Sequence, residues 1–425
     1  MYPERDEQAK QHVRGQTCLT WPSNVLPRAH RELEQLHAAG AVHKVHSALD
    51  ALIAELRRSA IDERLLCSGK SIIPDEVTYQ AAEQIEPGDP DVDHEGGIDW
   101  GAGSCVSAYM VGEGRVLVNN RGALQDLQRD STGTWSAQTL RRRPEQSLRG
   151  AGDAGRFRAD PMGGLFLVMP RYLPGVYSRP EERIGGELLQ LRKNAIGGWS
   201  WAAQGFIRNV KTFDVLPSGD VLAGGIGDLP VFRWNREGGE RWTAETSVRL
   251  QRSHVVRYGG MGRIITGDES TGLTSWRQSG IDWHREEIHK AWTTASRFAP
   301  LPNGRIVTVP HGWSPNMKFL SCQEETGWQP EAASIRFESH LHVQDLIPLL
   351  GEQILIRSKR LLSIASKDTA RSWRVRTVYS GEEELSHVSV ADDGRLVVSG
   401  AKTGERIGNN VKVVPWIKIL EPSRR

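Results

Sequence analysis

The sequence predicts a mainly β fold made of seven similar units, because two residue types recur in phase along most of its 425 residues. The first series is a set of tryptophans at gaps of 43, 41, 45, 45 and 43 residues, preceded by Trp135 at a gap of 64: Trp199, Trp242, Trp283, Trp328, Trp373 and Trp416. The second is a set of glycines that lie 21 to 24 residues before a tryptophan, or 35 in the case of Gly164: Gly114, Gly164, Gly219, Gly262, Gly304, Gly351 and Gly394. A unit of about 43 residues is the length of a four-stranded propeller blade. We therefore predict a seven-bladed β-propeller.

Each unit has the pattern of a β-hairpin around its glycine. Two β-rich runs flank a short Gly-containing turn in Phe213–Gly224, Phe298–Thr308 and His387–Gly400. Glycine suits this turn because a positive φ is costly for residues with a side chain. In the fourth unit, Arg263–Trp276 adds a third strand and Gly280–Trp283 begins a fourth. One such sheet cannot bury both faces alone, so neighbouring units must stack around an axis.

The segments His387–Gly400 and Gly262–Trp276 resemble WD40-like repeats, of the WD40/YVTN type. The resemblance covers roughly residues 100 to 421. This chain departs from the usual pattern, since Trp234-Asn235 and Trp276-Arg277 replace the Trp-Asp pair and the Gly-His before each unit is missing. The resemblance implies a propeller that serves as a binding platform.

Composition excludes several function classes. The net charge of +2 gives no global attraction to nucleic acid or to a membrane surface, and no run of 18 apolar residues is present. The four cysteines are far apart and match no metal-binding spacing. We expect a cytoplasmic protein with no cofactor and no metal.

The first hundred residues differ from the repeats. Residues 1–26 are polar, and we expect them to be disordered. Apolar residues at three- and four-residue steps predict a helical segment over 27–85, which either docks on the propeller or serves as a partner or dimerisation helix. Residues 86–104 have the composition of an acidic Gly/Pro-rich linker, and 105–421 form the propeller.

The linker also offers a way to close the ring. Gly97–Trp100 repeats the sequence of Gly280–Trp283, so Trp100 is our candidate for an N-terminal strand that completes the last blade. Val411–Leu420 is then the third strand of that blade, displaced by a longer loop at 402–410. In the competing interpretation, 411–420 is an outer strand and no N-terminal strand is needed.

Short motifs with a chemical meaning are weak. Cys67–Ser71 ends like a phosphate-binding loop but lacks the first glycine, because Arg64 stands there. The acidic run from Asp89 to Glu95 alternates like calcium ligands without the glycine and glutamate of an EF-hand. No catalytic constellation is recognisable from local spacing.

Alignment on the turn glycines yields one set of candidate residues. The candidates all fall seven to nine residues before a turn glycine, where the innermost strands begin: His254, Arg297, His342 and His387. In a propeller these positions converge at a mouth of the central channel. They either form a polar recognition ring, or ligate a metal through histidines with His340 beside His342, or tie the blades together by hydrogen bonds.

Two loops have the composition of contact surfaces. Pro170–Arg179 contains Tyr172, Tyr177 and Arg179, and Pro310–Pro315 contains Trp313. Tyr, Trp and Arg dominate binding hot spots, although inserted surface loops can also be neutral.

These observations predict a non-enzymatic protein-interaction scaffold that presents a propeller face and these two loops to a protein partner. The alternative is a propeller enzyme, a hydrolase or lyase with a His/Arg site at the channel mouth. Fold alone does not decide between them.

Overall fold

The computed structural model describes Ile53, residues 73–87 and residues 106–424, the last with gaps of which 143–154 and 173–183 are the longest. The chain divides into two compact units, residues 1–60 and 61–425, and all the described strands belong to the second. The predicted disordered segment 1–26 and nearly all of the predicted helical segment lie outside the described residues. No helix in the described part is long and apolar enough to cross a membrane.

The described residues form a mainly β structure, with strands paired into seven four-stranded antiparallel sheets. The first three sheets in chain order are β2 (Val106–Gly112), β3 (Arg115–Asn120), β4 (Ala123–Arg129) and β5 (Trp135–Arg141); β6 (Arg158–Ala159), β7 (Leu165–Tyr172), β8 (Ile184–Lys193) and β9 (Trp199–Arg208); and β10 (Val210–Val215), β11 (Val221–Gly225), β12 (Val231–Asn235) and β13 (Thr243–Val248). The next three are β14 (Val255–Gly260), β15 (Arg263–Asp268), β16 (Gly272–Ser279) and β17 (Asp282–Glu287); β18 (Phe298–Pro300), β19 (Ile306–Thr308), β20 (Asn316–Gln323) and β21 (Gly327–Arg336); and β22 (Asp345–Leu349), β23 (Gln353–Arg357), β24 (Leu361–Lys367) and β25 (Trp373–Ser380). The last sheet contains β26 (Leu385–Val390), β27 (Leu396–Ile407), β28 (Asn410–Arg424) and β1 (Val77–Ile85).

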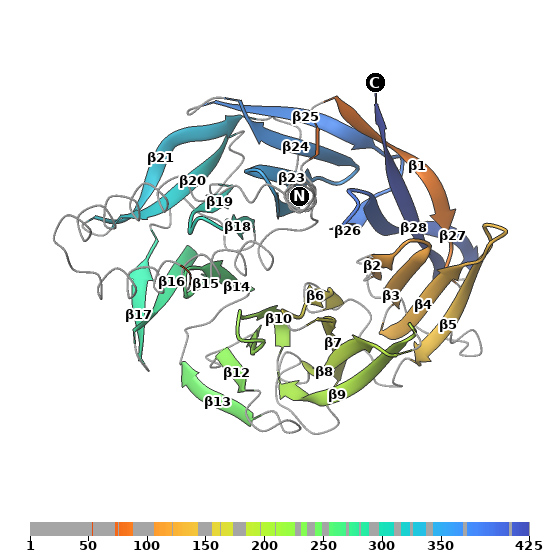
Figure 1. The fold of residues 1–425 in the computed structure, drawn as a ribbon, viewed down its shortest axis with the longest axis horizontal. Helices are drawn as coiled ribbons and strands as arrows, with labels where there is room; N and C mark the ends of the chain where they lie inside the picture. The colour runs from red at the N-terminus through yellow and green to blue at the C-terminus, as the bar shows by residue number, and fades with distance from the viewer. Residues whose placement is uncertain are drawn as a thin grey trace, which may run out of the picture. The chain divides into compact units, whose positions relative to one another are not determined.

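The sheets are arranged around a common axis as a β-propeller, with the first strand of each sheet innermost (Figure 1). Innermost strands of successive sheets are in contact, as β6 is with β10, β10 with β14, β14 with β18 and β18 with β22. Contact between β2 and β26 joins the first sheet in the sequence to the last. The predicted β-propeller is therefore the fold.

The turn glycines behave as the sequence predicts. All seven glycines of the periodic series have positive φ, between 62° and 114°, and all lie in the turn between the first two strands of a sheet. At Gly164 an added Cβ would collide with the carbonyl of Leu191. These positions thus require glycine for backbone reasons, and for close packing as well at Gly164.

The periodic tryptophans mark the outermost strands with one exception. Five of them lie on fourth strands: Trp135, Trp199, Trp283, Trp328 and Trp373. Trp242 lies outside the described residues. Trp416 instead lies on β28, a third strand, where it is fully buried and pairs with Gly400. An added Cβ at Gly400 would collide with the Trp416 ring and with the carbonyl of Glu384, so this tryptophan depends on the glycine opposite.

The last sheet is completed by a strand from the other end of the chain. β1 pairs antiparallel with β28, from Val77 opposite Arg424 to Ile85 opposite Ile417, and the two lie side by side in Figure 1. Val411–Leu420 belongs to the third strand, as predicted. The closing strand itself is Val77–Ile85, so the prediction of the Trp100 segment was wrong, and Trp100 lies outside the described residues.

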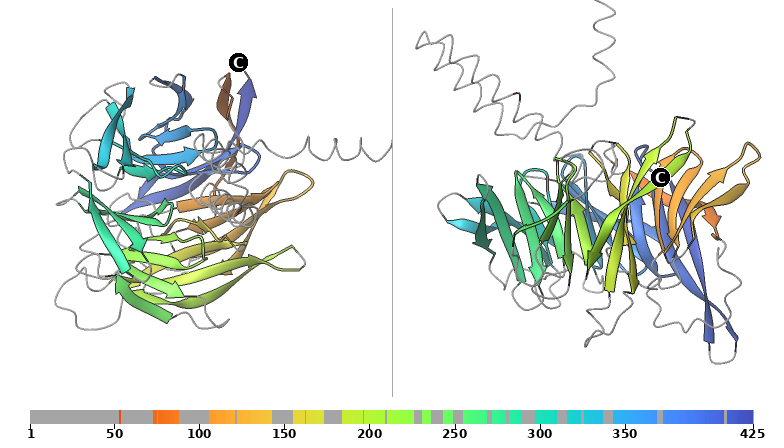
Figure 2. Two further views of the ribbon diagram at one scale, coloured as in Figure 1. Left: turned by 60° about the vertical axis from the view of Figure 1, so that its left-hand side comes forward. Right: turned by 90° about the horizontal axis from the view of Figure 1, so that it is seen from below.

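Two further predictions are corrected in this region. Residues 77–85, the end of the predicted helical segment, are extended, because burial follows Val77, Tyr79 and Ile85 and the strand pairs along its length with β28. The predicted loop 402–410 is mostly strand, since β27 runs to Ile407 and β28 begins at Asn410. Seen from the side, this long hairpin projects beyond the other sheets (Figure 2).

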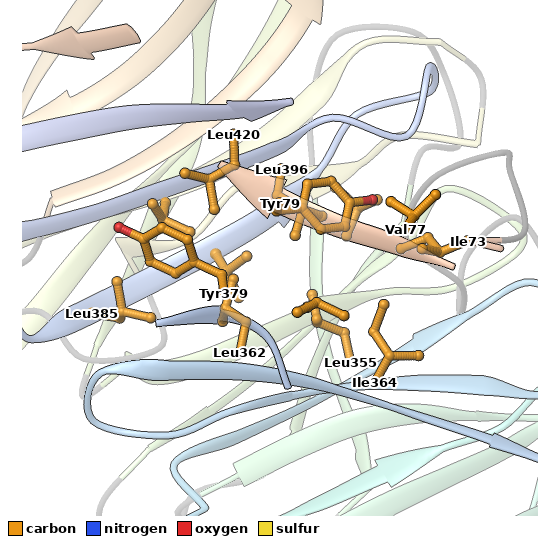
Figure 3. Packing of buried hydrophobic residues seen from close by; sticks show 14 of the residues in the cluster. Ile73, Val77, Tyr79, Leu355, Leu362, Ile364, Tyr379, Leu385, Leu396 and Leu420 are labelled. Carbon is orange, nitrogen blue, oxygen red and sulfur yellow. The ribbon is translucent and has the colours of Figure 1, made fainter. Parts of the chain in front are cut away.

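The closing strand is packed between sheets as well as paired. Ile73, Val77 and Tyr79 lie in one apolar cluster with leucines and isoleucines of β23 and β24 on one side and of β26, β27 and β28 on the other (Figure 3). Complete burial of an apolar side chain of this size contributes about 1.5–3 kcal/mol. The cluster therefore holds the last two sheets together around β1.

Polar contacts fasten both ends of the closing strand to the neighbouring sheets. The side chain of Gln353 binds both backbone groups of Ile73, at 2.9 and 2.7 Å, and the Arg376 guanidinium donates to the carbonyls of Pro74 and Val77. At the other end, Glu83 meets two side chains of the first sheet: it accepts from the Trp135 indole at 2.6 Å and forms an ion pair with Arg129 at 2.7 Å. β1 thus connects the first, sixth and seventh sheets.

We predict that Tyr79→Ala lowers the free energy of unfolding by about 3–5 kcal/mol, because it removes a buried ring from the cluster around β1. Tyr79→Phe should cost only about 1 kcal/mol, since it deletes the 2.7 Å hydrogen bond to the Gly394 carbonyl and keeps the ring. Urea unfolding followed by tryptophan fluorescence measures both. Equal stability of Tyr79→Ala and the wild type would contradict the role of β1 in closing the ring.

Candidate axial binding site

The predicted recognition ring is only partly within the described residues. His254, His342, Tyr177, Arg179 and Trp313 lie outside them. Tyr172 is the last residue of β7 and pairs with Ile184. The carbonyl of Arg297 accepts from the Val309 amide at 3.0 Å, so its backbone joins the start of β18 to the end of β19. The role of these residues in partner binding stays a prediction.

His387 is the predicted site residue whose surroundings are described most fully. It lies on the innermost strand β26, opposite Ser399 of β27, and only 8% of it is exposed. Burial, followed by the charges of Arg156 and Arg357, holds the pKa of His387 well below its usual value, although Asp345 acts in the opposite direction. The imidazole is therefore neutral near pH 7.

Arg156 reaches across the centre of the ring. Its guanidinium forms an ion pair with Asp345 at 2.6 Å, which joins the loop before β6 to the start of β22. The second and sixth sheets are three positions apart around the ring by the shorter route, so the pair spans the axis. Asp345 therefore links sheets that do not stack on each other.

The loop that carries Arg156 is anchored on both sides of it. The carbonyl of Gly155 accepts from the Ser107 hydroxyl at 2.6 Å and from the Asn119 amide at 2.9 Å. Phe157 is buried in an apolar cluster between the first two sheets. Because Gly155 and Phe157 are both held in place, the backbone at Arg156 is fixed and its side chain is directed toward the axis.

Arg357 lies on β23 beside the same carboxylate. One of its nitrogens donates to the Gln344 side chain and to the Leu385 carbonyl, both at 2.6 Å, and another lies 3.8 Å from Asp345. Only 7% of this side chain is exposed. Hydrogen bonds to charged groups in such a site are stronger than neutral ones, so the guanidinium is held in a defined orientation.

Arg158 and Asp214 extend the polar region toward the third sheet. Arg158, at the start of β6, lies 3.5 Å from the Asp214 carboxylate and 5.9 Å over the ring of Phe213. Asp214 also accepts from the Tyr258 amide at 2.7 Å, which ties β10 to β14. A fourth arginine, Arg257, donates to the Thr212 hydroxyl at 3.0 Å.

We call six of these residues the axial cluster: Arg156, Arg158, Asp214, Asp345, Arg357 and His387. With His387 neutral, three arginines face two aspartates, which leaves one positive charge in excess among the described residues of the cluster. A preorganised group of guanidinium forks with excess positive charge suits carboxylate and phosphate groups. No group of three or more His, Cys, Asp or Glu side chains in the described part could hold a metal ion.

Alignment of the repeats finds His387 but misses its neighbours. Arg156 falls eight residues before Gly164, within the same window as His387, and was passed over, whereas the other arginines and the aspartates of the cluster fall outside that window. A signal was present, however: Arg158 and Asp345 both fall six residues before a turn glycine, and Asp214 falls five before one. A charged residue at that distance from the turn glycine lies on or beside an innermost strand, so its position in the sequence indicates that it is near the axis.

The turn glycines, the hairpin pattern and the four-stranded sheets together decide the classification. The chain is a β-propeller. Among solved structures this propeller is similar to the WD40 β-propeller domain of Doa1, at 12% identity over 81% of this chain and 97% of that one, with a TM-score of 0.46. It is also similar to a streptogramin B lyase, at 8% identity over 81% and 98% of the two chains, with a TM-score of 0.49.

A third similar structure is virginiamycin B lyase from Staphylococcus aureus, at 8% identity over 80% of this chain and 99% of that one, with a TM-score of 0.48. No protein-family model matches the propeller, and no curated protein matches it significantly. Identities this low concern the fold alone, so only the chemistry of the axial cluster bears on function.

We predict that His387 makes this propeller less stable in mild acid. The unfolded chain takes up a proton at a pKa near 6.5, whereas the folded site keeps the imidazole neutral. The lowered pKa has no effect on stability above about pH 6.5, and below it the free energy of unfolding falls by up to about 1.4 kcal/mol per pH unit as the pH drops toward the lowered folded pKa. His387→Gln should remove this part of the pH dependence, which melting temperatures from about pH 7.5 to about pH 5 would measure. Parallel pH profiles for both proteins would contradict the prediction.

We also predict that the ion pair across the axis stabilises the ring. Asp345→Asn removes the carboxylate that pairs with Arg156 and lies near Arg357, and it should cost about 3 kcal/mol. The double variant Asp345→Asn/Arg156→Gln should be less destabilised than the sum of the single variants. A double-mutant cycle in urea measures this coupling, and strict additivity would show that the pair contributes nothing.

Proposed function

We propose that this chain is a non-enzymatic protein-interaction module, a seven-bladed propeller that presents the mouth of its axis to a protein partner. The axial cluster is the observation that carries the proposal. It gathers three arginines at the one place where all sheets converge, and rigid elements hold them in position. Arginine is among the residue types that dominate the energy of protein interfaces.

The contacts around the cluster favour binding over catalysis. Arg156, Arg357 and Asp345 hold one another in fixed geometry, and the neighbouring loop is anchored by Ser107 and Asn119. Such a site is preorganised, so little conformational entropy is lost when a partner binds. The loops with Tyr172, Tyr177, Arg179 and Trp313 are proposed as additional contacts, and a cytoplasmic location is part of the same proposal.

One observation favours the enzymatic alternative, a hydrolase or lyase. His387 is neutral near pH 7, as a general base has to be, and it lies in the cluster. Its lowered pKa makes it a weak base, however, and the nearby charges are mostly paired with one another. We therefore rank the interaction module first.

Site-specific photo-crosslinking tests the proposal. A benzophenone amino acid replaces Gln344, an exposed residue directly before Asp345, or in a matched control Arg374, an exposed residue on the outermost strand of the same sheet. The change at position 344 removes one contact of Arg357, whose hydrogen bond to the Leu385 carbonyl and proximity to Asp345 do not involve the Gln344 side chain. The intact protein is irradiated in lysate of its own source. We expect one defined protein adduct from position 344 and none from position 374.

The same adduct from both positions, or from position 374 alone, would contradict a partner at the axis. Absence of any protein adduct would also contradict the proposal. In that case, a small-molecule turnover that His387→Gln abolishes would establish the enzymatic alternative.

A further inference from the structure

His387 carries an unsatisfied polar atom inside the axial cluster. Its side chain is more than nine-tenths buried, and its Nδ1 has no hydrogen-bond partner among the described residues. A buried polar atom without a partner costs about 1–3 kcal/mol. Native structures keep such atoms rarely, and binding to a ligand is one of the accepted reasons.

The charges around His387 indicate the kind of ligand. Arg156, Arg357 and Arg158 all act on the imidazole electrostatically, and Asp345 acts on it in the opposite direction. Each guanidinium offers about five N–H donors, and the neutral imidazole offers one more on one of its two nitrogens. A ligand that enters among these groups has to be an acceptor and gains most if it is negatively charged.

Asp345 already shows what these groups can hold. Its planar carboxylate lies 2.6 Å from Arg156 and 3.8 Å from Arg357, so the cluster accommodates one oxyanion between two guanidinium groups. Arg158 lies 3.5 Å from the carboxylate of Asp214. The three arginines of the cluster outnumber its two carboxylates, so one positive charge of the cluster is in excess.

We propose that the axial cluster recognises an oxyanion carried by a peptide segment of the partner, held by Arg156, Arg158 and the Nδ1–H of His387. This inference rests on the proposed function and adds the chemistry of the partner. A glutamate or aspartate carboxylate and a phosphoserine phosphate are the two sources of that chemistry. The tautomer with the proton on Nδ1 donates to the oxyanion, which satisfies the atom that is otherwise without a partner.

Fluorescence anisotropy of labelled heptapeptides with the full chain tests the proposal. Four probes are used: a peptide with central glutamates, the same peptide with glutamines, the same peptide with a central phosphoserine, and inorganic phosphate as a competitor. We expect the glutamate or the phosphoserine peptide to bind, the glutamine peptide to bind at least tenfold more weakly, and rising salt to weaken binding. The charged peptide that binds more tightly identifies the source of the oxyanion. Competition by inorganic phosphate supports a phosphoserine phosphate as that source.

His387→Leu is the decisive variant. Because it removes a buried imidazole with an unsatisfied atom, the protein should be as stable as the wild type or more stable, yet bind the charged peptide at least tenfold more weakly. Arg158→Gln should also lose at least tenfold, and Arg158→Lys should recover part of the loss because it keeps the charge without the fork. Lys367→Gln is the matched control, since it removes one positive charge from an exposed pair with Glu352 and should leave affinity unchanged.

Two outcomes would overturn the proposal. One is equal affinity for the glutamate, glutamine and phosphoserine peptides. The other is unchanged affinity in folded His387→Leu and Arg158→Gln proteins, with melting temperatures as the check on folding. If position 344 still crosslinks to a partner while the charged peptides fail, the oxyanion proposal falls and the interaction module stands. If both experiments fail, the proposed function falls as well.

Discussion

The pairing of β1 with β28 is the constraint on which the rest of this structure depends. A propeller has no continuous sheet around its ring, so each sheet is held by packing against its two neighbours. The last sheet is made of β26, β27 and β28 from the C-terminal end of the chain and β1 from the other end. Closing the ring this way joins strands more than 300 residues apart, as Val77 opposite Arg424 illustrates.

Ring closure in turn makes the axial cluster possible. Arg156 precedes the second sheet and Asp345 begins the sixth, so their ion pair exists only while the intervening first and seventh sheets stay in place. Removing charges from water is costly, and the attraction between them compensates only when the geometry is good. The anchored Gly155 carbonyl and the hydrogen bonds of Arg357 supply that geometry. The result is a centre that is rigid, polar and slightly positive.

The sequence predicted those features of the fold that repeat. Each turn glycine has positive φ because a tight turn imposes the same backbone requirement in every sheet, and that requirement is visible in one sequence. The third-strand position of Val411–Leu420 was predicted only together with an N-terminal closing strand, and the structure decides for that arrangement over the outer-strand alternative. The closing strand was assigned to the wrong residues because β1 carries neither a turn glycine nor a periodic tryptophan. Its alternation at Val77 and Tyr79 is too short to stand out beside a strong helical pattern.

The site was predictable in part for the same reason. His387 was found because it shares a position with residues of other repeats. Its neighbour Arg156 falls in the same window before Gly164 but was not selected, and what joins Arg156 to Asp345 is an ion pair across the axis that no local spacing encodes. The burial that lowers the pKa of His387 is likewise a property of the assembled ring. Interactions between distant sheets therefore need the structure.

Native-state hydrogen exchange read by mass spectrometry tests the central claim, that β1 closes the ring as a full member of the last sheet. We expect amides of Val77–Ile85 to exchange as slowly as those of β28, because both strands are released only when the ring opens. Exchange of Val77–Ile85 within seconds, while β26 and β28 stay protected, would show that the ring is closed without β1 and would contradict this claim.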